Sequence, residues 1–180
     1  SPILTNTQFK KFKKFFSKKV RVIDCTFDIE GSLKERIESI RKEAETAVRE
    51  GSTCLVLSDK NIFNQKASIP SILTVGAVHS HLVKHGLRGY CSLNVECSDA
   101  MDTHSFAILI GVGATTVNPY LAIDSIYQRF EKRLFGKSEF ETCVNKFKKS
   151  IDAGLLKIMS KMGISVISSY RGGCNFEAVG

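Results

Sequence analysis

The fold is decided by a run of six residues, Thr53-Cys54-Leu55-Val56-Leu57-Ser58. Almost all of them are apolar, which is typical of a strand that is covered on both faces, as the strands of parallel sheets are. A second β-rich run precedes it at residues 20–27. Between the two runs, apolar residues recur at helical spacing over residues 33–48, and Gly51 marks the end of this predicted helix. The N-terminal part of the chain therefore predicts a strand–helix–strand unit.

The same alternation continues along the chain. The pattern predicts, in order, a helix over 70–86, a strand over 91–96, a helix over 98–111, an extended segment at 115–117, a helix ending at 130, a helix over 138–162 and a strand over 164–168. Strands that alternate with helices at this spacing indicate the α/β class with a parallel sheet and right-handed crossovers. Periodicity alone leaves two architectures open, a barrel and an open doubly wound sheet.

Residues 1–19 form a separate predicted segment, an amphipathic helix. Phe9, Phe12 and Phe16 recur at helical spacing, and lysines occupy the other faces. The chain has 26 Lys+Arg against 18 Asp+Glu, and residues 1–23 hold seven basic residues and no acid. The rest of the chain is therefore nearly neutral, which argues against a nucleic-acid partner. We expect the phenylalanine stripe to pack on the body; the alternative is a helix that binds a membrane surface or nucleic acid.

The cysteine content indicates a reducing compartment. The six cysteines include no Cys-x-x-Cys pair, which argues against a zinc ribbon or a redox motif. Several lie in apolar, strand-like runs, as small buried residues do in cytoplasmic proteins. No apolar stretch reaches about 18 residues and no signal-peptide pattern is present, so we expect no membrane partner. The chain starts with Ser1-Pro2, and we expect it to be part of a longer protein.

Polar residues follow the predicted strands, where α/β proteins form their sites. The segments at these carboxyl ends are 24–28, 58–66, 96–104 and 168–175. Within them, the candidate acid–base residues are Glu96, Asp99, Asp102 and His104. Residues of these types serve equally well as helix N-caps and first-turn acids, so both interpretations stay open.

Motifs for cofactors and metals are weak. Gly111-Val112-Gly113 lacks the third glycine of a dinucleotide fingerprint and follows a predicted helix, and no Walker loop is present. Arg171 precedes two glycines and suits an anion, but one strand and one loop do not close a pocket. His81 and His85 share a helix face. No third ligand lies at useful spacing, so we expect surface histidines and no metal site.

Ordered blocks along nearly the whole chain resemble the large (alpha) chain of glutamate synthase, a flavoprotein that makes two glutamate from glutamine and 2-oxoglutarate. These blocks lie at residues 1–5, 22–27, 55–59, 69–79, 104–107, 117–122 and 157–165. The resemblance implies an N-terminal helical segment at 1–19, the central α/β domain at 20–156 and the start of the FMN-binding synthase barrel at 157–180. The implied fold is a degenerate (β/α) barrel-like domain, incomplete at its C-terminus.

The resemblance also implies a role without catalysis. The central domain of the family carries no catalytic residue, links the glutaminase and synthase sites, and helps to form the passage for ammonia. The alternative is a free-standing α/β module that binds a ligand. Either way we expect the isolated chain to be inactive, and we expect exposed apolar residues on the Phe9–Phe16 helix and after Ile164 where neighbouring domains dock.

Cofactors and partners are likewise implied by the resemblance. FMN and an iron–sulfur cluster belong to the parent enzyme, and this chain is expected to hold neither of them and no metal. Ser165, Ser168, Tyr170 and Glu177 are expected near the cofactor or substrate edge of the parent enzyme. The expected partners are the remaining domains of the large chain and either a small NADPH-dependent subunit or ferredoxin, in the cytoplasm or, for a photosynthetic eukaryote, the plastid stroma.

Overall fold

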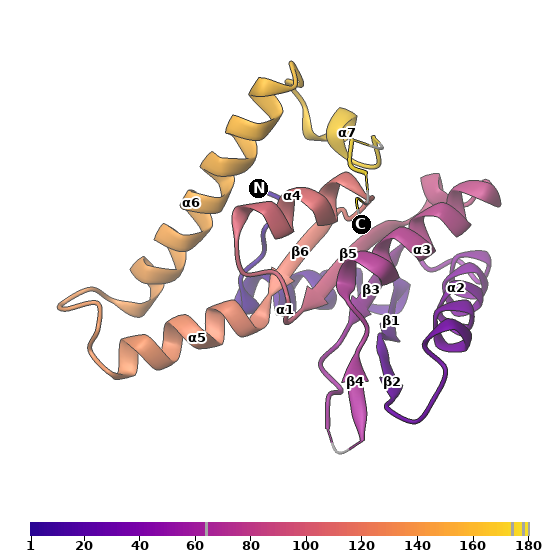
Figure 1. Cartoon of the computed structure of the whole chain (residues 1–180), viewed down its shortest axis with the longest axis horizontal. Helices are drawn as coiled ribbons and strands as arrows, with labels where there is room; N and C mark the ends of the chain where they lie inside the picture. Colours follow the sequence, from indigo (N-terminus) through magenta and orange to yellow (C-terminus); the bar gives the residue numbers. More distant parts are fainter. Residues whose placement is uncertain (64, 174, 178, 180) are drawn as a thin grey trace.

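The computed structural model describes residues 1–63, 65–173, 175–177 and 179, and its centre is a four-stranded parallel sheet (Figure 1). The strands stand in the order β1-β3-β5-β6. Their bounds are Val20–Asp24 for β1, Cys54–Ser58 for β3, Ser92–Cys97 for β5 and Thr116–Pro119 for β6. All three pairings are parallel. The prediction of an α/β fold built from strand–helix repeats is confirmed, and the sheet of the described chain is open.

Three crossover helices connect these strands. They are α2 (Leu33–Arg49), α3 (Ser71–Lys84) and α4 (Thr103–Gly111). Because the strands follow one another in spatial order and such crossovers are right-handed, the three helices cover the same face of the sheet. Leu55, Leu57, Leu93 and Val95 lie in the main core with residues of these helices and are at most 1% exposed. We call this side the outer face, by analogy with a barrel.

The helix α1 (Asn6–Phe16) covers the opposite, inner face of the sheet. Thr5 and Gln8 close the capping box at its start. Phe9, only 1% exposed, packs with Cys54 and Val56 of the central strand β3. These two residues alternate with Leu55, which faces the other way. The prediction that the phenylalanine stripe packs on the body is confirmed.

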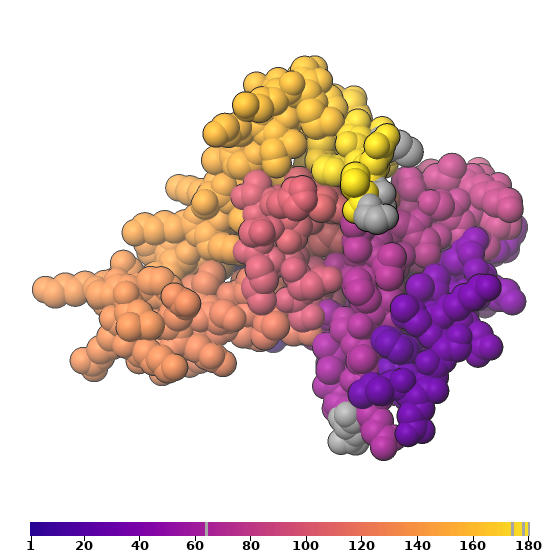
Figure 2. Space-filling view, in the orientation of Figure 1, coloured from indigo at the N-terminus to yellow at the C-terminus, as the bar shows by residue number. Residues whose placement is uncertain are grey.

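A pair of helices extends from the sheet as an arm. These are α5 (Tyr120–Glu131) and α6 (Phe140–Lys161), and Figure 2 shows their junction projecting from the body. The helix α6 meets α5 near their junction, where Phe140 contacts Tyr127 and Phe130, and then packs against α4, where the rings of Phe106 and Phe147 meet edge to face. No helix in the described part of the chain is long and apolar enough to cross a bilayer.

Smaller elements complete the chain. The predicted strand 20–27 is divided at Cys25 into β1 and β2, and β2 pairs antiparallel with β4 in a ribbon beyond the carboxyl end of the sheet. The ribbon strands are Thr26–Asp28 and Lys66–Ser68, and two short 3₁₀ helices span Ser17–Lys19 and Arg88–Tyr90.

The prediction of a last strand at residues 164–168 is wrong. Residues Ile167–Tyr170 form the short helix α7 instead. A strand needs a free sheet edge, and the edge beside β6 is taken by the N-terminal segment: the N–H of Leu4 donates to the carbonyl of Val117 at 2.9 Å. The segment therefore packs through Tyr170, which is 1% exposed and donates its hydroxyl to the carbonyl of Ala107 at 3.0 Å.

Replacing Phe9 by alanine is expected to lower the free energy of unfolding by about 3–5 kcal/mol, because it opens a cavity between α1 and β3. Phe15 lies on the same helix but is 83% exposed, so Phe15→Ala is the matched control and should change stability by less than about 0.5 kcal/mol. Urea denaturation followed by circular dichroism measures both. Equal effects of the two substitutions would contradict the placement of α1.

Candidate functional site at the carboxyl edge of the sheet

Two of the predicted strand-end segments, 58–66 and 96–104, meet at the carboxyl edge of the sheet. Ser58 ends β3 and stands in register with Glu96 of the neighbouring strand β5. Polar side chains gather here; Ser58, Asp59, Ser71 and Glu96 are buried, and polar groups are costly to bury without partners. The cluster consists of Ser58, Asp59, Ser71, Glu96, Ser98 and Asp99. Its hydrogen bonds determine what the edge is able to do.

Glu96 is the charged centre of this cluster, with a side chain only 5% exposed. Its carboxylate accepts a hydrogen bond from the Ser58 hydroxyl at 2.8 Å and lies 2.9 Å from the Lys60 ammonium. Lys13 reaches it from α1 at 3.4 Å. Burial by itself would raise the pKa of Glu96, but the bonds from Lys60 and Ser58 and the charge of Lys13 outweigh it and lower the pKa. Glu96 is therefore an ionised, fully engaged carboxylate.

Asp59 and Asp99 connect neighbouring loops by hydrogen bonds. One oxygen of Asp59 accepts from the backbone N–H of Ser98 at 2.9 Å and from its hydroxyl at 2.6 Å. Asp99 accepts from the N–H of Ser71 at 2.9 Å and from its hydroxyl at 2.6 Å. Pro70, the N-cap of α3, offers no side-chain bond, so Asp99 caps that helix from the next loop.

Asp102 and His104 do not join the cluster. Asp102 is the N-cap of α4 and accepts from the N–H and the hydroxyl of Ser105, both at 2.8 Å. These two bonds lower the pKa of Asp102. His104 is exposed in the first turn. Of the two interpretations left open by the sequence, the capping role describes Asp99 and Asp102.

The cysteine beside the cluster is not a nucleophile. Cys97 ends β5 and is 1% exposed. Burial, and then the charges of Asp99 and Asp59, raise its pKa well above the usual range, which keeps the thiol protonated and unreactive.

The other predicted site residues lie elsewhere. Ser165 and Ser168 are exposed near α7, Glu177 is exposed, and Tyr170 is buried against α4. None of them lies at the carboxyl edge with Glu96, because the predicted strand that would have carried them there is absent. Sequence reasoning missed Lys13 as a member of the edge cluster, since nothing along the chain relates it to a strand 83 residues away.

Comparison with known proteins gives the family. The profile of the glutamate synthase central domain matches residues 1–180. The chain belongs to this family. It is 50% identical over its whole length to the "Glutamate synthase [NADPH] large chain" of Azospirillum brasilense and 42% identical to that of Bacillus subtilis. It is also 38% identical to the chloroplastic "Ferredoxin-dependent glutamate synthase" of Spinacia oleracea. The chain spans 12% of the length of each of these three relatives.

One solved structure shows the same kind of fold. DHODH of Eimeria tenella, solved in complex with ferulenol, superposes with a TM-score of 0.56 at 14% identity, over 88% of this chain and 38% of the other. At this identity the likeness concerns the chain path alone. It agrees with the order of strands and helices in this chain, which is that of a (β/α) barrel. The sheet of this chain, however, is open.

Glu96→Gln is expected to lower the free energy of unfolding at neutral pH by about 1–3 kcal/mol, because it removes the charge that accepts from Ser58 and pairs with Lys13 and Lys60, while both lysines can still reach water. A carboxyl whose pKa is lowered by folding stabilises the native state above its unfolded value, near 4.5, and loses that contribution as the pH falls. The variant should therefore lose less stability than the wild type between neutral and acid pH. Urea titrations at both pH values measure this, and parallel pH profiles would contradict the assignment.

Proposed function

We propose that this chain is the non-catalytic central domain of a glutamate synthase large chain. In such a protein it connects the glutaminase domain to the synthase domain and forms part of the passage for ammonia, and residues 157–180 lead into the synthase domain. This proposal rests on the contacts at the carboxyl edge of the sheet, where α/β proteins usually bind substrates. Here the edge is occupied by the chain's own ionic and hydrogen-bonded ties, centred on Glu96.

The inner face supports the same conclusion. In a complete barrel this face is filled by layers of side chains from the other strands, and the active site lies above them. Here α1 takes that place, and its Lys13 neutralises Glu96 at the edge. A free general base or an anion-binding loop is not part of this arrangement in the described residues.

The FMN expected in the parent enzyme does not fit the residues that the resemblance suggested. The hydroxyl of Tyr170 is bonded to the carbonyl of Ala107, and Ser165, Ser168 and Glu177 are exposed and form no common cradle. We therefore assign FMN and the iron–sulfur cluster to other parts of the large chain. The electron donor is NADPH through a small subunit, or ferredoxin, in the cytoplasm or the plastid stroma.

Exposed apolar residues support a connecting role. Phe15 is 83% exposed on α1 and Val166 54% exposed after α6, in the two segments where docking was expected. The arm adds Leu134, at 64%, and Leu156, at 65%. Leu156 borders an apolar hollow that Leu155, Met159 and Ile167 also line. Since the relatives are far longer than this chain, neighbouring domains are the natural cover for this surface.

The isolated chain is expected to hydrolyse no glutamine and to bind no FMN, because its edge cluster holds neither an activated nucleophile nor a phosphate site. Fluorescence titration of FMN and a coupled glutamate assay measure the two properties. Micromolar FMN binding, or glutamine hydrolysis above the rate of buffer alone, would contradict the proposal.

Within a complete glutamate synthase large chain, Leu156→Asp is expected to lower the amount of glutamate formed from each glutamine consumed. A charge on this surface disturbs the docking of the neighbouring domain and lets ammonia escape. Lys157→Asp, on another face of α6, is the control and should keep the wild-type yield. Released ammonia and glutamate are measured together, and an unchanged yield in Leu156→Asp would remove this surface from the connection.

A further inference from the structure

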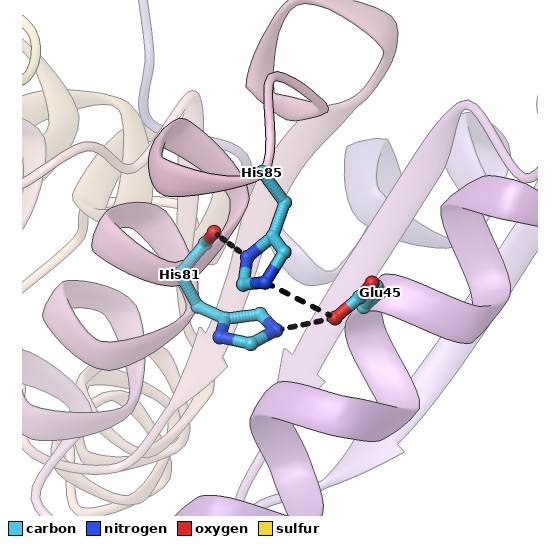
Figure 3. A group of neighbouring side chains, drawn as sticks. All are labelled: Glu45, His81 and His85. Carbon is cyan, nitrogen blue, oxygen red and sulfur yellow. Dashed lines mark hydrogen bonds and ion pairs between the residues drawn. The ribbon is translucent and has the colours of Figure 1, made fainter.

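Glu45, His81 and His85 meet on the outer side of the sheet, away from the carboxyl edge (Figure 3). Glu45 lies in the last turns of α2, and the two histidines lie one turn apart at the end of α3. We propose that these three side chains bind a divalent zinc ion through the Glu45 carboxylate and the Nε2 atoms of His81 and His85. Their nearest ligand atoms all lie within 4.8 Å of one another.

His85 is held in the tautomer that a metal requires. Its Nδ1 lies 2.8 Å from the carbonyl oxygen of His81, which can only accept a hydrogen bond. The proton of the neutral ring therefore sits on Nδ1, and Nε2 carries a lone pair. This Nε2 faces Glu45 at 4.0 Å. A histidine that donates its other ring proton to a backbone carbonyl is the usual arrangement at metal centres.

Glu45 is oriented by a residue outside the cluster. Arg49 donates to Oε1 from Nε at 2.9 Å and lies 2.8 Å from it through Nη2. The other oxygen, Oε2, is left to face the two imidazole rings. The bonds from Arg49 and His81 lower the pKa of Glu45, so the carboxylate is ionised and able to bind a cation at neutral pH.

His81 is the most buried of the three side chains, which corrects the expectation of two surface histidines. The residue is 9% exposed, and its Nδ1 is buried without a hydrogen-bond partner in the described part of the chain. Only Nε2 is engaged, at 2.7 Å from Oε2 of Glu45. In the proposed centre the zinc ion takes the place of the proton between Nε2 and Oε2, and the neutral ring carries its proton on Nδ1.

The distances are close to those of a zinc centre. Bonds of about 2.0–2.1 Å in a tetrahedron place neighbouring ligand atoms roughly 3.3 Å apart. The measured separations from Oε2 of Glu45, 2.7 Å to His81 and 4.0 Å to His85, lie on either side of this value. Small side-chain rotations therefore satisfy the geometry. Two imidazoles and one carboxylate suit zinc, and the exposed side of His85 leaves a fourth position for water.

The function of such an ion is to join α2 to α3. Both helices end here, at the amino end of the sheet, whereas the hydrogen bonds around Glu96 lie at its carboxyl end. An ion that binds only the folded chain stabilises it by mass action. The simpler alternative is a plain hydrogen bond between Glu45 and His81, which would not respond to zinc.

The test uses the purified 180-residue chain in chelator-treated buffer, titrated with Zn²⁺ by calorimetry and by thermal unfolding. We expect one equivalent to bind, and Tm to rise by about 5–10 °C when Zn²⁺ is at 100 times its Kd. His85→Gln and Glu45→Gln should each weaken binding about 100-fold and reduce the rise to about 1 °C at the same Zn²⁺ concentration. His104→Gln, the matched control at an exposed histidine, should bind as the wild type does.

A Co²⁺ titration identifies the ligand type. Nitrogen and oxygen ligands give visible d–d bands without the near-ultraviolet charge-transfer band of a thiolate, and the buried thiols with raised pKa values are not competitors. Should Glu45→Gln disturb the fold without metal, His85→Gln decides, because its side chain is 34% exposed. Three results would each overturn the proposal. The first is a wild-type Tm that does not change with Zn²⁺, the second is a thiolate band in the Co²⁺ spectrum, and the third is a Zn²⁺ affinity of His85→Gln equal to that of the wild type.

Discussion

The structure depends on keeping both faces of a parallel sheet away from water. Leu55 and Leu57 face the crossover helices, whereas Cys54 and Val56 face the other way and need separate cover. In a closed barrel that cover comes from the remaining strands. Here it comes from Phe9 on α1, which is why a helix rich in lysine packs on the body by its phenylalanines.

The position of α1 also sets the chemistry of the carboxyl edge. With Phe9 over β3, the next turn of the helix brings Lys13 to Glu96, where Lys60 and Ser58 already converge. A buried carboxylate with two cations and a hydroxyl is stable as an internal tie and has little capacity left for a substrate. In many α/β proteins this end of the sheet holds the catalytic residues. Here its side chains hold β3, β5 and α1 together.

The two ends of the sheet thus carry different kinds of polar group. At the carboxyl edge, the carboxylates accept hydrogen bonds from hydroxyls and backbone N–H groups and pair with lysines, although Oδ1 of Asp59 is buried without a partner in the described residues. At the amino end, His81 retains an unpartnered ring nitrogen beside Glu45 and His85. The arm of α5 and α6 exposes Leu134 and Leu156. The carboxyl edge, where barrel enzymes bind their substrates, is therefore filled by the chain's own side chains.

Local sequence by itself determined the α/β class, the buried strand at residues 54–58 and the amphipathic α1, because these depend on periodicity and caps within a few residues. It also located Glu96 at the end of a strand and Asp99 just after it. Only the tertiary structure decided that residues 164–168 form no strand, since the N-terminal segment occupies the sheet edge beside β6. Likewise it alone brought Lys13 to Glu96 and Glu45 to His81, pairs 83 and 36 residues apart. Such partners are set by the packing of helices on the sheet, which no local pattern encodes.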